Sequence, residues 1–318
     1  MQPIEQFRIV VFLGVVVAVY VLAARILVRL ILRRFGLITT IAQGRKLVWS
    51  RRIILALAGI GTLCIAYGFL VEPYWLEVTH VRIESPKLPK GSRPIRIVHI
   101  SDLHSERKAR LEDRLPGIIA AEKPDLIVFT GDSLNEAEGL PVFKACLTKI
   151  AAFAPTFAVR GNWDAWYWHD LDLFGGTGAI ELKSEAVRVE IRGTPLQIAG
   201  VRVEGEHLIG MALAKIPPGE LSVFLHHYPD EIEEVARRKV DLYCAGHIHG
   251  GQIALPFYGA LVTLSKYGKR FEAGLYRVGE TWLYVNRGIG MEGGETPRVR
   301  FCARPEVTVI EIHPVGGR

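Results

Sequence analysis

The chain has 318 residues, enough for one large domain or two ordinary ones, and 49% of them are hydrophobic, a high share for a purely soluble enzyme. The formal net charge is +6, but residues 72–318 carry 30 bases and 32 acids, so the positive excess belongs to the first 71 residues. The downstream part therefore lacks the basic surface of a nucleic-acid-binding protein, and no nucleic-acid partner is predicted.

Two long apolar runs at the start of the chain predict helices that span a membrane. Residues 53–71 contain no charge, and these nineteen residues approach the roughly 20 that are needed to cross the hydrocarbon core. Residues 9–32 are interrupted only by Arg25 and Arg29, whose long side chains can reach the headgroups from one end of the helix. We predict a membrane anchor over residues 1–71 with these two runs as its spans.

The segment between the two runs carries six bases and no acid. These bases are Arg33, Arg34, Arg45, Lys46, Arg51 and Arg52. Short basic loops stay on the cytoplasmic side of a membrane, so a two-helix hairpin would place the downstream domain on the opposite side. The stretch SRRIIL also resembles a twin-arginine export signal, although its place after another apolar run favours a plain positively charged anchor.

The rest of the chain reads as a connector over residues 72–94, with a strand at 77–84, followed by a domain over residues 95–318. Short apolar runs bounded by turn residues predict buried strands, and residues 110–123 predict a helix. The strands are expected at 95–100, 125–130, 156–160, 221–225 and 240–245, with further ones at 76–80, 187–193, 196–205, 281–286 and 307–314. This mixture indicates an α/β domain with two sheets and outer helices.

The four cysteines have neither the spacing of a zinc motif nor that of a disulfide framework. Cys64 lies in the second apolar run. The other three, Cys146, Cys244 and Cys302, are scattered, and we expect them to be buried free thiols.

The main predicted strands end in polar residues of a common kind. The endings SDLH, GDS, GNWD, HHYPD and GHIHGGQ supply Asp102, His104, Asp132, Asn162, His226, His227, His247 and His249. Ligands of open α/β sheets bind beyond the carboxyl ends of the strands, so we expect these side chains in one crevice. The alternation of an extended chain would point both residues of DLH, and both histidines of HIH, the same way. Imidazole and carboxylate suit Mn, Fe, Zn or Ni, and so many donors favour two ions that share a carboxylate.

These motifs resemble those of the calcineurin-like metallophosphoesterases, which run D-x-H, G-D, G-N-H-D/E, H and G-H-x-H. Here they read DLH, GD, GNWD, HHYP and GHIH, and the resemblance covers about residues 95–314. The stretches GHIHGGQI, VNRGIG and RPEVTVIEI are similar to the bacterial membrane-anchored branch and to transmembrane proteins with a metallophosphoesterase domain. The resemblance implies a four-layer α/β/β/α sandwich after the two membrane helices, two divalent ions, and a multi-pass location in a bacterial inner membrane.

The resemblance also implies a role for each polar residue. It assigns Asp102, His104 and His249 to one ion, Asn162, His227 and His247 to the other, and Asp132 to a bridge, with Asn162, His227 and Asp132 as the catalytic residues. The spacing H-x-P selects His227 and leaves His226 to support the ligands from outside. Manganese is the favoured ion, with iron, zinc and nickel as alternatives.

The sequence departs from the family at Trp163, where a histidine usually assists the leaving group or steadies the phosphate. An indole N–H donates a hydrogen bond but supplies no proton at neutral pH. The ions alone can suffice for a stable leaving group, or His169, His226 or Arg160 can take over the role, or the protein can bind without turnover. We favour the first two explanations together, because no metal ligand has been lost.

Three further residues are predicted to contact the substrate or support the site. Arg160, Arg287 and Trp163 are expected to bind substrate, since arginine suits bidentate contact with phosphate, although ion pairs explain the arginines equally well. Asp164 is expected to orient His247 or another ligand, or to cap a turn.

Aromatic residues follow the third strand, and an apolar stretch follows the last histidine. They are Trp163, Trp166, Tyr167 and Trp168, and the stretch LPFYGALVTL at residues 255–264. Both groups can receive acyl chains or lie at the bilayer interface, where Trp and Tyr are enriched, or they can simply pack around the metals.

We therefore predict a metal-dependent phosphoesterase that hydrolyses a phosphodiester or pyrophosphate bond with water activated by two metal ions. Its substrate would be a phosphorylated small molecule or lipid in or near the membrane, and no protein partner is predicted. One alternative is a UDP-2,3-diacylglucosamine-type pyrophosphatase of lipid A synthesis, which needs a cytoplasmic active site. Another is a non-catalytic membrane receptor or scaffold that retains the metal-bound fold.

Overall fold

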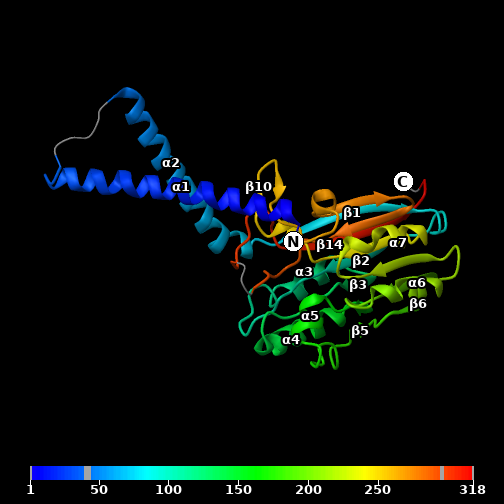
Figure 1. Cartoon of the computed structure of the whole chain (residues 1–318). Coiled ribbons are helices and arrows are strands. Elements are labelled where there is room, and N and C mark those ends of the chain that lie inside the picture. The colour runs from blue at the N-terminus through cyan, green and yellow to red at the C-terminus, as the bar shows by residue number, and fades with distance from the viewer. Residues whose placement is uncertain (1, 39–43, 294–296, 317–318) are drawn as a thin grey trace. The chain divides into compact units, whose positions relative to one another are not determined.

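The computed structural model describes residues 2–38, 44–293 and 297–316, and the chain divides into two compact units, Met1–Val71 and Glu72–Arg318. The first unit consists of α1 (Pro3–Arg34) and α2 (Arg45–Leu70) (Figure 1). Both helices are long and apolar enough to cross a membrane, and they make the chain a membrane-associated protein. Residues 39–43, part of the predicted basic loop, lie outside the described residues.

The two helices of the first unit extend beyond the apolar runs into charged residues, whose backbone groups continue the helical hydrogen bonding. The bases Arg33 and Arg34 occupy the last turn of α1, and Arg45 begins α2. The helices contact each other through the hydroxyls of Tyr20 and Thr62, whose oxygens are 3.0 Å apart.

The second unit contains two six-stranded mixed sheets and a small hairpin. In spatial order the first sheet is β1 (Glu77–Ser85), β14 (Glu306–Pro314), β2 (Ile95–Ile100), β3 (Leu126–Phe129), β4 (Thr156–Ala158) and β5 (Ile180–Glu181). The second is β12 (Gly274–Val278), β13 (Thr281–Val285), β9 (Leu242–Ala245), β8 (Leu221–Leu225), β7 (Thr194–Gly200) and β6 (Glu185–Ile191). The hairpin pairs β10 (Ala254–Leu255) with β11 (Gly259–Ala260).

The strands that precede the predicted site run in parallel. In the first sheet β2, β3, β4 and β5 are parallel neighbours, and in the second β7, β8, β9 and β13 are. Parallel strands bring their carboxyl ends to the same edge of a sheet. In the first sheet β14 lies between β1 and β2, parallel to β1 and antiparallel to β2 (Figure 1).

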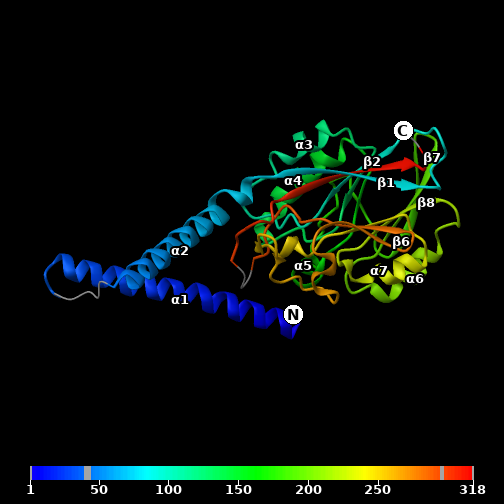
Figure 2. The same cartoon turned by 90° about the horizontal axis from the view of Figure 1, so that it is seen from above.

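Three hydrophobic clusters divide the domain into four layers. One lies between the sheets and joins residues such as Ile97 and Phe157 to Ile198 and Leu242. A second covers the outer face of the first sheet with α3 (Leu115–Ala121) and α4 (Leu140–Ala151), and a third covers the second sheet with α6 (Ile209–Ala214) and α7 (Ile232–Arg237). Figure 2 shows these two helix pairs on opposite sides of the strands. The fold is the predicted α/β/β/α sandwich.

Three sequence-based expectations about the domain were inaccurate. The helix predicted over residues 110–123 is only α3, because the Glu112 carboxylate accepts the backbone N–H groups of Arg110 and Leu111 and holds a turn there. The strand predicted over residues 196–205 ends at Gly200. Cys302 is exposed, whereas Cys146 and Cys244 are buried free thiols as expected.

A buried carboxylate joins the two sheets at the end opposite the metal ligands. Asp241, just before β9, accepts hydrogen bonds from Ser85 at the end of β1 and from both the backbone N–H and the hydroxyl of Ser222 in β8. Lys87 forms an ion pair with it at 2.9 Å. These four donors keep the charge satisfied where it is shielded from water.

We expect Asp241→Ala to lower the free energy of unfolding by about 3 kcal/mol, because the buried donors around it lose their acceptor. Thermal unfolding of the detergent-solubilised chain, followed by circular dichroism, measures the change. Asp172→Ala is the control, since the Asp172 side chain is 73% exposed. Equal melting temperatures for the two variants would show that Asp241 does not hold the sheets together.

Candidate metal centre

The seven predicted ligands lie in the loops and turns that follow parallel strands. Asp102 and His104 follow β2, Asp132 follows β3, Asn162 begins α5 (Asn162–Tyr167) after β4, His227 follows β8, and His247 and His249 follow β9. All are buried except His247, which is partly exposed. The fold therefore brings the polar ends of five strands together at one edge of the sandwich.

The backbone at these ligands is strained. The φ angles are positive at Asp102 (50°), His104 (44°), Asp132 (57°), His247 (71°) and His249 (53°). A non-glycine residue in this region costs roughly 1–3 kcal/mol, and such residues cluster at functional sites. The expected extended geometry of the two motifs was wrong, because β2 and β9 end before the ligands and the chain turns.

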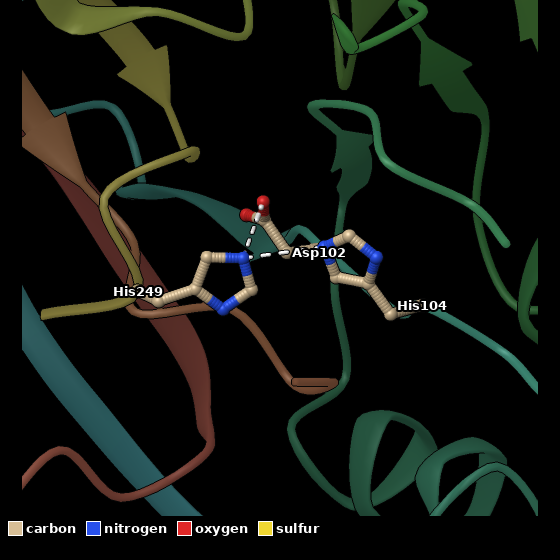
Figure 3. Close-up of side chains that lie close together, drawn as sticks. All are labelled: Asp102, His104 and His249. Carbon is tan, nitrogen blue, oxygen red and sulfur yellow. Dashed lines mark hydrogen bonds and ion pairs between the residues drawn. The ribbon is translucent and has the colours of Figure 1, made fainter. Parts of the chain in front are cut away.

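One group of possible ligands consists of Asp102, His104 and His249, whose ligand atoms all lie within 4.8 Å of one another. The Nε2 atom of His249 is 3.3 Å from an oxygen of Asp102 and 3.3 Å from Nε2 of His104. Figure 3 shows the two rings approaching each other beside the carboxylate. Three converging donors of this type suit a divalent cation.

A second group consists of Asp102, Asp132 and His227. Nε2 of His227 is 3.3 Å from Asp132 Oδ2 and 3.9 Å from Asp102 Oδ1. Asp132 Oδ2 also lies 3.6 Å from Nε2 of His104 in the first group. Both carboxylates thus adjoin both groups, so the geometry offers a second possible bridge, Asp102, beside the predicted one.

The two remaining predicted ligands lie next to these groups. Asn162 is buried between Gly161 and Trp163, and the backbone N–H of Trp163 donates to Asp132 Oδ1 at 2.8 Å. The backbone N–H of His247 is 3.2 Å from both carboxylate oxygens of Asp102. Its ring packs edge-on against the rings of His227 and Tyr228.

Two glycines allow the loop of Asp132 to approach that of Asn162. Gly131 has a φ of +102°, and a Cβ there would lie 2.3 Å from the nitrogen of Gly161. A Cβ on Gly161 would lie 2.2 Å from Asp132 Oδ1. These contacts leave no room for a side chain, so both glycines are needed to place the carboxylate.

Asp164 connects the same two loops. Its carboxylate accepts the backbone N–H groups of Asp132 (2.9 Å), Ser133 (2.9 Å) and Gly161 (3.0 Å). These contacts fit both predicted alternatives, because the carboxylate closes the turn at Gly161 and also holds the backbone of the predicted ligand Asp132. Burial and then the charge of Asp132 raise the pKa of Asp164 to about 6.

Trp163 covers the first group of ligands. Its ring meets that of His104 edge to face at 5.3 Å, and Tyr167 packs on it at 5.0 Å. Its indole N–H donates to the Glu292 carboxylate, whose pKa is raised first by burial. The neighbouring aromatics divide between core and surface, because Trp168 donates to the Leu134 carbonyl at 3.0 Å whereas Trp166 is 54% exposed.

The two arginines predicted to clamp phosphate have other partners. Arg160 pairs with Glu181 at 2.8 Å and donates to the carbonyls of Trp168 and Leu171, so it fixes the loop after α5. Arg287 pairs with Glu77 at 2.8 Å and with Glu306 at 3.1 Å. These contacts fit the alternative of ion pairs, and substrate binding by either arginine stays a prediction.

Two histidines, His169 and His226, are candidates to replace the family histidine that is absent at position 163. They differ in their exposure to solvent. His169 is 65% exposed and pairs with Asp170 at 3.0 Å. His226 is fully buried, with Nδ1 2.7 Å from the Val201 carbonyl and its ring stacked on Phe224.

Sequence reasoning missed residues from the C-terminal part of the chain that adjoin the ligands. Arg300 is fully buried, donates to the Gly290 and Ala303 carbonyls, and lies 3.2 Å from Nδ1 of His249. Glu292, described above, receives the indole of Trp163. Neither residue belongs to a recognised motif. The available signal is their position in the sequence, between the stretch VNRGIG and the last strand.

Comparisons with known proteins agree with the geometry. Residues 95–251 match the family model described as calcineurin-like phosphoesterase. The chain is 33% identical to an uncharacterized metallophosphoesterase, YkuE, of Bacillus subtilis over 80% of this chain and 92% of that protein. It is 30% identical to the phosphodiesterase YaeI of Escherichia coli over 84% of this chain and 100% of that one. It is also 27% identical to the UDP-2,3-diacylglucosamine pyrophosphatase LpxG of Chlamydia trachomatis, over 76% and 90%.

The chain belongs to the calcineurin-like metallophosphoesterases.

This metallophosphoesterase is accordingly a hydrolase of phosphate ester bonds, and members of its family use two divalent metal ions. Its site fits such ions, because several buried polar atoms have no hydrogen-bond partner among the described residues. They include Oδ1 of Asn162 and Nε2 of His227. Atoms of this kind are costly to bury unless a ligand completes them.

The pKa of His227 in the metallophosphoesterase site is shifted in the opposite direction from those of His104 and His247. Burial alone would lower the pKa of His227, but the carboxylates of Asp132 and then Asp102 raise it to about 9. Burial lowers the pKa of His104 to about 4 and that of His247 to about 3. A cation that binds between His227 and the two carboxylates must therefore displace a proton from His227 near neutral pH.

We expect the metal affinity of the chelator-treated metallophosphoesterase to rise about tenfold per pH unit between about pH 7 and about pH 9, as one proton is displaced. The sign follows from the raised pKa, since the competing proton is bound below it and lost above it. Competition with a fluorescent chelator measures the affinity.

His227→Gln removes the group that holds the competing proton. We expect the metal affinity of this variant to be lower and to depend much less on pH. His226→Gln is the matched control, because burial lowers the pKa of His226 to about 4 and keeps it neutral throughout this range. A pH-independent affinity in the unaltered protein would contradict the assignment of His227.

Proposed function

We propose that this chain hydrolyses a phosphodiester or pyrophosphate bond in a lipid or lipid-linked substrate. The supporting observation is the pair of adjoining ligand groups that share Asp102, in a domain joined directly to two apolar helices. A membrane anchor raises the local concentration of every substrate in the same bilayer. Phosphodiesterase and pyrophosphatase relatives cover both kinds of bond.

In this proposal Asp102, His104 and His249 hold one ion, and Asn162, His227 and His247 hold the other, with Asp132 between them. Two divalent ions, when bound, polarise the phosphoryl oxygens and provide a strong nucleophile at neutral pH. The protein's own contribution is to fix these ligands. Asp164 fixes the loop of Asp132, and Trp163 packs against His104.

Manganese is the proposed ion, because mixed imidazole and carboxylate ligands accept it and also admit iron, zinc or nickel. Purified full-length protein in lipid nanodiscs would be stripped with chelator and reloaded with each ion singly. Hydrolysis of bis-p-nitrophenyl phosphate reports the phosphodiesterase reaction without requiring the natural substrate. The absence of metal-stimulated hydrolysis on this substrate and on every phospholipid or nucleotide conjugate tested would overturn the proposal.

A second candidate is a UDP-2,3-diacylglucosamine-type pyrophosphatase, which the similarity to LpxG favours. Its test is the release of UMP from the diacylated nucleotide sugar in the same nanodiscs. That activity requires the site on the cytoplasmic side, whereas the six bases between the apolar runs favour the other side.

The two candidates therefore predict opposite topologies in a bacterial inner membrane. Fusion of alkaline phosphatase or green fluorescent protein to the C-terminus separates them, because each reporter is active on only one side. Active phosphatase and dark fluorescent protein are expected for the leading proposal, and the reverse pattern would favour the pyrophosphatase.

A further inference from the structure

The hairpin that follows the metal ligand His249 presents a large aromatic side chain to solvent. Phe257, between β10 and β11, is 112% exposed and has a φ of 65°, and its neighbour Tyr258 is 43% exposed. Leu264 shortly after the hairpin is 40% exposed and also has a positive φ, 53°. The fold thus holds apolar side chains away from its core in conformations that non-glycine residues rarely adopt.

Charged side chains behind the hairpin keep it in this position. Lys269 donates to the carbonyls of Tyr258 (2.7 Å) and Ala260 (3.0 Å), and its ammonium group lies 4.2 Å from the centre of the Tyr258 ring. Glu272 accepts the backbone N–H of Ala260 at 2.8 Å and pairs with Lys269. The exposed tip is therefore a fixed projection and not a loose loop.

The segment that carries the tip is rich in bases, two of which pair with neighbouring carboxylates, Lys266 with Glu231 at 3.3 Å and Lys269 with Glu272. Residues 255–270 contain three bases and no acid. These bases are Lys266, Lys269 and Arg270, and Lys266 and Arg270 are exposed. Exposed aromatics combined with lysine and arginine are typical of segments that lie in the headgroup region of a bilayer with anionic lipids.

The hairpin is connected to the place where the chain enters the domain from α2. Ala254 donates its backbone N–H to the Phe301 carbonyl at 2.8 Å. The next residue, Cys302, donates its backbone N–H to the carboxylate of Glu72, the first residue of the domain. The half-exposed Trp75 follows, with the guanidinium of Arg304 at 4.3 Å over its ring. A short series of backbone contacts therefore links the hairpin to the segment that carries Trp75, four positions after the anchor.

We propose that the tip of this hairpin, with Phe257 and Tyr258, lies in the headgroup region of the bilayer that holds α1 and α2, together with Leu264 shortly after the hairpin. The entry of the chain through Glu72 supplies the proximity, the aromatics supply apolar contact, and the exposed Arg270 complements anionic headgroups. Because the hairpin begins just after the ligand His249, this contact turns the metal site toward phosphate groups at the membrane surface. This last step rests on the proposed function, but the contact itself does not.

The contact is tested with an environment-sensitive nitrobenzoxadiazole label on the full-length protein in vesicles of phosphatidylethanolamine and phosphatidylglycerol. Native Cys64 and Cys302 are replaced in a Cys64→Ala, Cys302→Ser background, and the buried Cys146 and Cys244 are retained. Labels are placed with Phe257→Cys and Leu264→Cys on the surface, and with Phe153→Cys as the matched control, since Phe153 is 45% exposed after α4.

We expect shallow spin-labelled lipids to quench the labels at 257 and 264 at least about threefold more than the label at 153, with iodide from the water showing the reverse order. Equal quenching at all three sites would overturn the proposal. Protection from iodide without quenching by lipid would assign the surface to a second protein molecule and would also overturn it. Because the readout needs no catalysis, its failure is distinguishable from a failure of the phosphoesterase proposal.

Discussion

Asp132→Asn is expected to reduce metal-stimulated hydrolysis of bis-p-nitrophenyl phosphate by roughly a thousandfold. The amide oxygen can still accept the backbone N–H of Trp163, which now bonds Oδ1 at 2.8 Å. Its NH₂ group would then take the place of Oδ2, which lies 3.3 Å from His227 and 3.6 Å from His104. A neutral donor at this point removes the negative charge between the two ligand groups and opposes bound cations.

Steady-state rates and metal content by mass spectrometry would be measured together for this variant. Loss of activity with at least one metal ion lost per chain is the expected pattern. Asp113→Asn, which neutralises an exposed aspartate of the same domain, is the matched control and should keep both. Unchanged rates and metal content in Asp132→Asn would exclude Asp132 from the metal centre.

Asp164→Asn is expected to act through the ligand loop without touching an ion. An amide in place of this carboxylate cannot accept all three backbone N–H groups of Asp132, Ser133 and Gly161, and its own NH₂ would face one of them. A buried donor left in this way costs roughly 1–3 kcal/mol of stability. Displacement of the Asp132 backbone should also weaken metal binding about 10–100-fold, as for other groups that support ligands.

The two effects of Asp164→Asn are separated by measuring thermal stability without metal and the activity as the metal concentration is raised. We expect high metal concentration to restore much of the rate, because all seven proposed ligands remain. Asp170→Asn is the control, since that side chain is 89% exposed and pairs with the exposed His169. A rate that stays low at saturating metal would indicate a direct role for Asp164 in the reaction.

The sequence was sufficient to predict the strands and the strand-end residues because both signals are local. A run such as IRIVHI specifies a buried strand by its composition, and the polar residues after it must then emerge at the strand's carboxyl end. Asp102, Asp132 and His227 therefore lie together although they are distant in the sequence. Local reasoning did not reproduce the positive φ angles, which depend on contacts between loops, such as that of Gly131 with Gly161.

The roles of the charged residues could not be predicted in the same way, because each depends on a partner chosen by the fold. Arg287 meets Glu77, which is 210 positions away in the chain. Arg300 is buried beside His249, where a sequence would place an arginine at the surface. A guanidinium group is recognisable from sequence, but its partner is not, and the partner decides whether it can bind phosphate.

The pairing of the first sheet determines when the domain can fold during synthesis. Strand β14 lies between β1 and β2, so a nascent chain cannot close this sheet until residues 306–314 have left the ribosome. By that time the two apolar helices have long since left the ribosome. The polypeptide after them therefore completes its first sheet only long after both helices have been synthesised.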